Sequence, residues 1–66
     1  MAILLEIDFG KDQKPAIEAI LQKLNPKPNY ASTEAKGAVH YSIQLEDAYQ
    51  VYEFGHQQGR FNPLRT

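Results

Sequence analysis

The chain contains no cysteine and no tryptophan among its 66 residues. Without cysteine, disulfide bonds and thiolate zinc sites are excluded. Neither positive nor negative charge is in excess, since the chain has seven Lys and Arg and eight Asp and Glu. A dedicated nucleic-acid-binding domain is usually strongly basic, so this balance disfavours that class.

Long hydrophobic runs are missing as well. No apolar stretch approaches the roughly 20 residues that span a bilayer, and the first residues lack the pattern of a signal peptide. We therefore expect a soluble, cytoplasmic protein that makes no membrane contact. The motifs GxGxxG, GxxxxGK[ST], HExxH and GxSxG are also absent, and these motifs mark common nucleotide-binding and hydrolytic sites. For so short a chain, we predict no catalytic activity, no cofactor and no metal.

What is present is a set of clear periodic patterns. The first segment, AILLEIDFG, alternates between inward and outward positions and predicts a strand that ends at Gly10. One face of this strand would carry Ile3, Leu5, Ile7 and Phe9, and the other Leu4, Glu6 and Asp8. Further along, two prolines in NPKPNY predict an extended connector. A hairpin follows, with arms at 30–35 and 38–45 and a turn at Lys36-Gly37.

Two segments have the apolar spacing of amphipathic helices. We expect the first to be capped by Asp12 and closed by Pro26. Its apolar residues are Ala16, Ile17, Ile20, Leu21 and Leu24. The second follows Asp47, whose distance in sequence from Gln50 is that of a capping box. Its expected buried stripe consists of Ala48, Val51, Tyr52, Gly55 and Gly59, with Gly55 at a close backbone contact and Gly59 as the stop signal.

The order strand, helix, strand, strand, helix predicts an α+β fold. It would contain a three-stranded antiparallel sheet with two helices on one face. This order resembles a ferredoxin-like split β-α-β module that lacks its last strand. The resemblance implies that the first strand pairs with the third and that the second forms an edge. We expect one domain over residues 1–60 and a C-terminal tail over residues 61–66.

The first strand would then have no neighbour on its outer side. It carries a run of apolar residues suited to a central strand, namely Ile3, Leu4, Leu5 and Ile7. A chain of this size buries only about 60% of its unfolded surface, so extra burial would stabilise it. A twofold-related copy that pairs first strand to first strand would cover this edge. Alternatively, residues 61–64 could return as a short fourth strand, with Pro63 tolerated at an edge. We prefer the homodimer.

Three surfaces are candidates for function. The open face of the sheet would place Glu6 and Asp8 near His40, Ser42 and Gln44, a set that can bind a metal or transfer protons. We interpret it instead as a solvated polar face. A flank of the second helix would present Tyr49, Tyr52, Glu53 and His56, extended by Tyr30, and tyrosine is typical of protein–protein contacts.

The third surface is a set of cations on loops and helix ends: Lys11, Lys14, Lys27, Lys36, Arg60 and Arg65. They support an alternative in which the protein is a small nucleic-acid-binding accessory or transcriptional factor. We favour a small protein–protein interaction or regulatory module that forms a homodimer and binds a further, unidentified protein.

Overall fold

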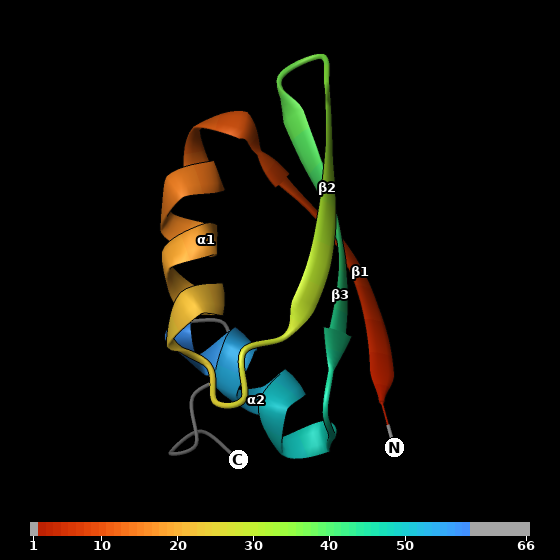
Figure 1. Cartoon of the computed structure of the whole chain (residues 1–66). Helices are drawn as coiled ribbons and strands as arrows, with labels where there is room; N and C mark the ends of the chain where they lie inside the picture. The colour runs from red at the N-terminus through yellow and green to blue at the C-terminus, as the bar shows by residue number, and fades with distance from the viewer. Residues whose placement is uncertain (1, 59–66) are drawn as a thin grey trace.

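The computed structural model describes residues 2–58 (Figure 1). Its elements are β1 (Ile3–Gly10), a short 3-10 helix (Lys11–Gln13), α1 (Lys14–Lys23), β2 (Asn29–Ala35), β3 (Ala38–Leu45) and α2 (Ala48–Gln57). The predicted α+β class and element order are thereby confirmed. Several sequence predictions lie outside the described residues: the stop at Gly59, the cations Arg60 and Arg65, and the tail over residues 61–66 with Pro63.

The three strands form one antiparallel sheet in the order β1-β3-β2. The strand β3 is therefore central, as expected, and both β1 and β2 are outer strands. A two-residue turn joins β2 to β3, and both of its residues have positive φ, 51° for Lys36 and 81° for Gly37. Such turns match the right-handed twist of the paired strands, and glycine adopts the required conformation without strain.

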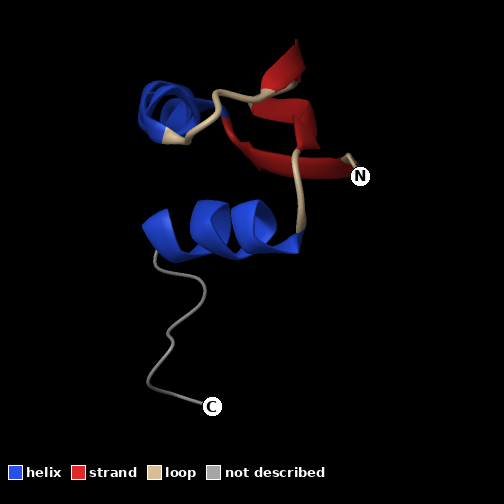
Figure 2. Cartoon of the chain, turned by 60° about the horizontal axis from the view of Figure 1, so that its bottom comes forward, coloured by secondary structure: helices blue, strands red, loops and turns tan. Residues whose placement is uncertain are grey.

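The core lies on one face of the sheet, where both helices cover it (Figure 2). The central strand contributes four fully buried side chains to it: Val39, Tyr41, Ile43 and Leu45. The helices add Ile17, Leu21 and Phe54, each no more than 4% exposed. Because successive side chains of a strand point to opposite faces, the even-numbered residues of β3 lie on the uncovered face.

Three details of the helices differ from the sequence predictions. Ala16, which was expected on the apolar face of α1, is exposed. Asp12 does not cap α1, because it lies inside the 3-10 helix, and α1 begins after Gln13 with no side-chain cap. In α2, the buried stripe runs through Gln50, Phe54 and Gly55, whereas Ala48 is exposed. The burial of Gly55 is confirmed.

The start of α2 is fixed by two side chains. Asp47 accepts a hydrogen bond from the backbone N–H of Gln50 at 2.9 Å, as a helix cap does. The Gln50 side chain accepts one from Glu46 N–H at 2.8 Å and donates one to the Pro26 carbonyl at 2.7 Å. Gln50 is therefore buried because its amide links α2 to the proline-rich connector.

Candidate functional site

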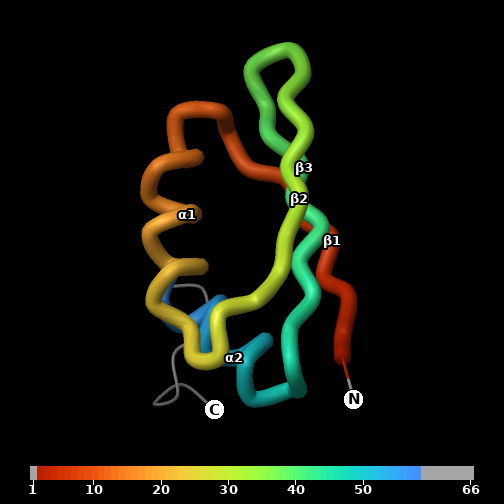
Figure 3. The backbone as a smooth tube through the Cα atoms, viewed as in Figure 1, coloured from red at the N-terminus to blue at the C-terminus, as the bar shows by residue number. Residues whose placement is uncertain are grey.

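The outer edge of β1 is the first candidate site. Within residues 2–58, β1 is paired only with β3, and it runs along the outside of the sheet (Figure 3). The register extends to the backbone N–H of Lys11, which donates to the carbonyl of Gly37 at 2.9 Å. Bonded and unbonded pairs alternate along an antiparallel ladder, so the odd-numbered residues of β1 direct their backbone groups toward β3. The residues of β1 whose backbone N–H and C=O groups point away from the sheet are Leu4, Glu6, Asp8 and Gly10.

This edge has two chemically different halves. Its N-terminal half is apolar, and Leu4 and Ile3 remain 58% and 36% exposed. Its C-terminal half carries the carboxylates of Glu6 and Asp8 on the uncovered face. Leu5 and Ile7 point the other way and pack partly against the core. The edge thus offers backbone groups that pair with no strand among residues 2–58, beside exposed apolar surface, and this combination favours addition of another strand.

The second candidate site is a cluster around His40 on the uncovered face. His40 lies opposite Asp8 in the register, and its Nδ1 is 2.6 Å from Asp8 Oδ1. Its Nε2 is 2.9 Å from Glu6 Oε1. The Ser42 hydroxyl donates to the same Glu6 oxygen at 3.3 Å. The structure therefore brings together four of the five polar residues that alternation placed on this face, and Gln44 takes no part in these contacts.

These contacts favour the charged form of the ring. Hydrogen bonds from His40 to Glu6 and Asp8 raise the pKa of the imidazole above its ordinary value of 6.5. In its charged form the ring donates from both nitrogens, and neither then has a lone pair for a metal or a proton. Within residues 2–58, no group of three or more His, Cys, Asp or Glu side chains has a geometry that could hold a metal ion.

The tyrosine flank of α2 forms a ridge in which Tyr49 and His56 are exposed and Tyr52 and Glu53 are half-buried. The rings of Tyr49 and Tyr52 lie 6.3 Å apart, and Tyr52 stacks on His56 at 5.7 Å with an interplanar angle of 9°. Tyr49 is 68% exposed. Glu53 accepts a hydrogen bond from the Gln57 amide at 3.4 Å. These four predicted contact residues therefore belong to one surface.

Tyr30, which the sequence grouped with that flank, lies elsewhere. It is half-buried on β2 and its ring is 5.9 Å from the ring of Tyr41 in the core. Burial and the nearby Glu18 raise its pKa. The same two causes raise the pKa of Tyr41 to about 12, and the Tyr41 hydroxyl donates to Glu18 at 3.2 Å. Tyr30 thus supports the packing of β2 under α1.

The four predicted cations that lie within residues 2–58 do not form one patch. Lys11 lies 3.7 Å from a Glu34 oxygen, and Lys14 is hydrogen-bonded to the other oxygen of the same carboxylate. This contact raises the pKa of Lys14 and lowers that of Glu34. Lys36 lies at the hairpin tip, and Lys27 lies in the connector at the opposite end of the molecule (Figure 1). Nothing in the sequence pattern singled out Glu34 as the partner of two lysines.

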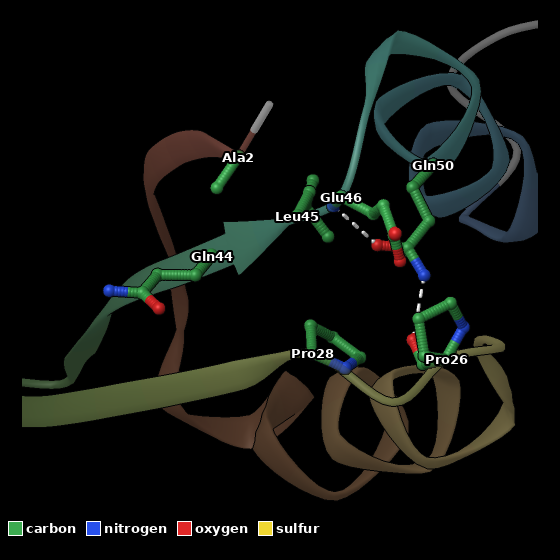
Figure 4. Close-up of a pocket in the computed structure, with 7 residues that line it drawn as sticks. All are labelled: Ala2, Pro26, Pro28, Gln44, Leu45, Glu46 and Gln50. Carbon is green, nitrogen blue, oxygen red and sulfur yellow. Dashed lines mark hydrogen bonds between the residues drawn. The ribbon is translucent and has the colours of Figure 1, made fainter.

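A shallow pocket lies where the connector meets the end of β3 (Figure 4). Its lining consists of Ala2, Pro26, Pro28, Gln44, Leu45, Glu46 and Gln50. Gln50 is the central polar group, and both ends of its amide already bond neighbouring backbone groups. The amide of Gln50 therefore has its oxygen and its nitrogen already bonded within the chain.

Comparisons with known proteins add no family. No protein-family model, curated protein or solved structure matches this chain. No helix in the described part of the chain is long and apolar enough to cross a membrane.

Proposed function

We propose that this protein is a small protein–protein interaction module that forms a homodimer through β1 and has no catalytic activity. The observation that supports the proposal most strongly is the outer edge of β1. Its outward N–H and C=O groups lie beside the exposed Leu4, and a strand added there would satisfy these groups and bury apolar surface. An added copy would also enlarge the core of a domain with marginal stability of its own.

The α2 ridge extends this proposal to a second partner. Tyr49 is largely exposed and stands next to Tyr52. Tyrosine is enriched at protein interfaces because its ring is apolar and its hydroxyl forms hydrogen bonds. In a dimer joined through β1, each subunit would present one such ridge to an unidentified regulatory target. We place this activity in the cytoplasm, where a chain without cysteine has no disulfide to lose.

The other function classes receive less support from the geometry. An enzyme would need an acid or base whose pKa suits the reaction in a partly dry site. The side chain of His40 is instead 42% exposed, and it is bonded by two carboxylates. A nucleic-acid platform would need gathered cations, whereas Lys11 and Lys14 share one carboxylate.

The proposal is tested by the mass of the protein in solution and by two proline variants. We expect a mass of two chains by light scattering at micromolar concentration. Leu4→Pro removes an N–H that points away from the sheet, so the fold should survive while the dimer dissociates. Leu5→Pro is the matched control, because the Leu5 N–H faces β3 and its loss should unfold the domain.

Two results would contradict the proposal. The first is a mass of one chain for the unmodified protein. The second is a Leu4→Pro protein that keeps both its circular dichroism spectrum and a dimeric mass, since the dimer would then use another surface. Binding to generic DNA or RNA that weakens steeply with salt would instead favour the nucleic-acid alternative.

A further inference from the structure

We infer that the twofold axis of the homodimer passes beside Leu4, so that Leu4 pairs with Leu4 of the second copy. This inference rests on the proposed function, and it specifies which residues of the two chains meet. Only residues with outward backbone groups can form the bonded pairs across the new edge. In β1 these are the even-numbered residues, as the register and the Lys11 to Gly37 bond require.

A twofold axis at Leu4 pairs the two apolar halves of the edge. Leu4 would contact its own copy on the uncovered face, and Ile3 would lie opposite Leu5 of the second copy on the core face. The exposed area of Leu4, 58%, and of Ile3, 36%, would be reduced by these contacts. Glu6 would lie opposite Ala2, a residue without charge. The surface is therefore complementary to itself, as a twofold interface must be.

Charge argues against the symmetric registers that are shifted toward the acidic half of the edge. With the axis at Leu4, the two copies of Glu6 lie two residues on either side of it, about 13–14 Å apart along the strands. This exceeds the Debye length of about 10 Å at 0.1 M salt, so their repulsion is largely screened. An axis at Leu5 would bring the two copies of Glu6 to diagonal positions about 7–8 Å apart. An axis at Glu6 would place them directly opposite each other.

The neighbouring histidine does not remove this preference. His40 contacts Glu6 and Asp8 of its own chain, so even a protonated ring leaves each cluster with a net negative charge. Two such clusters still repel when the strands slide toward the acidic half. The apolar half is thus the part of the edge that can approach its own copy at the smallest electrostatic cost.

Single cysteines measure this register directly, because the chain has no cysteine of its own. The Cα atoms of a bonded antiparallel pair are about 5.5 Å apart, a distance that suits a disulfide. Under mild oxidation, we expect Leu4→Cys to shift most of the protein to twice the chain mass on a non-reducing gel. Leu5→Cys, Glu6→Cys and Asp8→Cys should remain largely at the mass of one chain. Asn29→Cys, at the same level of the sheet on the β2 edge, is the matched control.

A second variant keeps Leu4 intact. In the inferred register Ala2 lies opposite Glu6 of the second copy, so Ala2→Cys combined with Glu6→Cys should also give the doubled mass. These two positions are too far apart along one strand to react within a chain.

The outcomes separate the register from the dimer itself. If light scattering gives two chains and Leu5→Cys or Glu6→Cys crosslinks in preference to Leu4→Cys, the inferred axis is wrong but pairing through β1 stands. If the mass is that of two chains and no β1 cysteine crosslinks, both the axis and the use of β1 are wrong. A mass of one chain overturns the proposed function and this inference together.

Discussion

The two outer strands of the sheet, β1 and β2, differ in what they expose. Each is paired only with β3 within the described residues. The strand β2 exposes small and polar side chains, and its Glu34 is held by Lys11 and Lys14. The strand β1 exposes Leu4 and part of Ile3. Charged and polar groups on an edge discourage pairing with other chains, whereas exposed apolar groups favour it.

The direction of the backbone groups adds to this difference. On β2, the register with β3 places the outward amides at the residues whose side chains face α1, among them Glu34. Ion pairs with the start of α1 therefore lie beside that edge. On β1, the outward amides belong to residues whose side chains lie on the uncovered face. Within residues 2–58, ion pairs thus lie beside the β2 edge and none lies beside the apolar half of the β1 edge, which is the edge at which we propose that a second copy pairs.

The largest expected effect is on the stability of the fold, and it comes from a substitution in β3, the strand that pairs with both β1 and β2. Ile43 is fully buried and lies opposite Leu5 on one side and Tyr30 on the other. Ile43→Ala should lower the free energy of unfolding by about 2–5 kcal/mol, since it removes buried methyl groups and leaves a cavity. Chemical denaturation measures this, with Ser42→Ala on the opposite face as the control. An unchanged midpoint would mean that the two edges do not share this core.

The next largest effect is on self-association, and it should differ between the β1 edge and the β2 edge. Leu4→Asp would place two carboxylates opposite each other at the inferred axis, so we expect self-association to weaken by about tenfold or more, which corresponds to about 1.4 kcal/mol. Asn29→Asp introduces the same side chain at the same level of the sheet on β2 and should leave the dissociation constant unchanged. Sedimentation at several concentrations gives both values. If Asn29→Asp weakens the dimer more than Leu4→Asp does, the second copy pairs with the β2 edge rather than with the β1 edge.

Much of the difference between the edges could be predicted from the sequence. The alternation in β1 and β3 and the Lys36-Gly37 turn are local signals, and they were sufficient for the hairpin and for the face of each residue. The strand order came from the resemblance of the element order to a split β-α-β module. They also placed Glu6, Asp8 and His40 on one surface. The sequence did not reveal which pairs would bond, because the contacts of His40 depend on a register fixed by the whole sheet.

The errors in the helices have the same origin. Gln50 is buried because its amide bonds the carbonyl of Pro26, which is 24 positions away in the chain. A polar residue with such a distant partner has no signature in a local apolar pattern. Asp12 failed as a cap because a 3-10 helix separates β1 from α1, and short helical turns of this kind lack a distinct apolar period.

A smaller effect on the melting temperature is expected from the contact between His40 and the acidic half of β1, and this effect should depend on pH. The pKa of His40 is raised above its ordinary 6.5 by Glu6 and Asp8, so the contact stabilises the fold fully below about 6.5 and is lost as the pH rises through the raised value. The melting temperature of His40→Gln should therefore fall below that of the unmodified protein at pH 5.5 and match it at pH 9. His56→Gln is the control, and an equal difference at both pH values would contradict the assignment.

The smallest effect is expected at the β2 edge. Lys14 and Lys11 lower the pKa of Glu34 from its ordinary 4.5, so this contact stabilises the fold above that value and is lost as the pH falls through the lowered one. All three side chains are substantially exposed, and exposed ion pairs contribute little because water and salt screen them. Glu34→Gln should lower the melting temperature only slightly at pH 7, and the difference should vanish in about 1 M salt.

The same variant tests whether Glu34 protects the β2 edge from pairing with other chains. If it does, Glu34→Gln should associate more strongly than the unmodified protein at high concentration. An unchanged association constant would assign the protection of β2 to its small polar side chains rather than to its ion pairs.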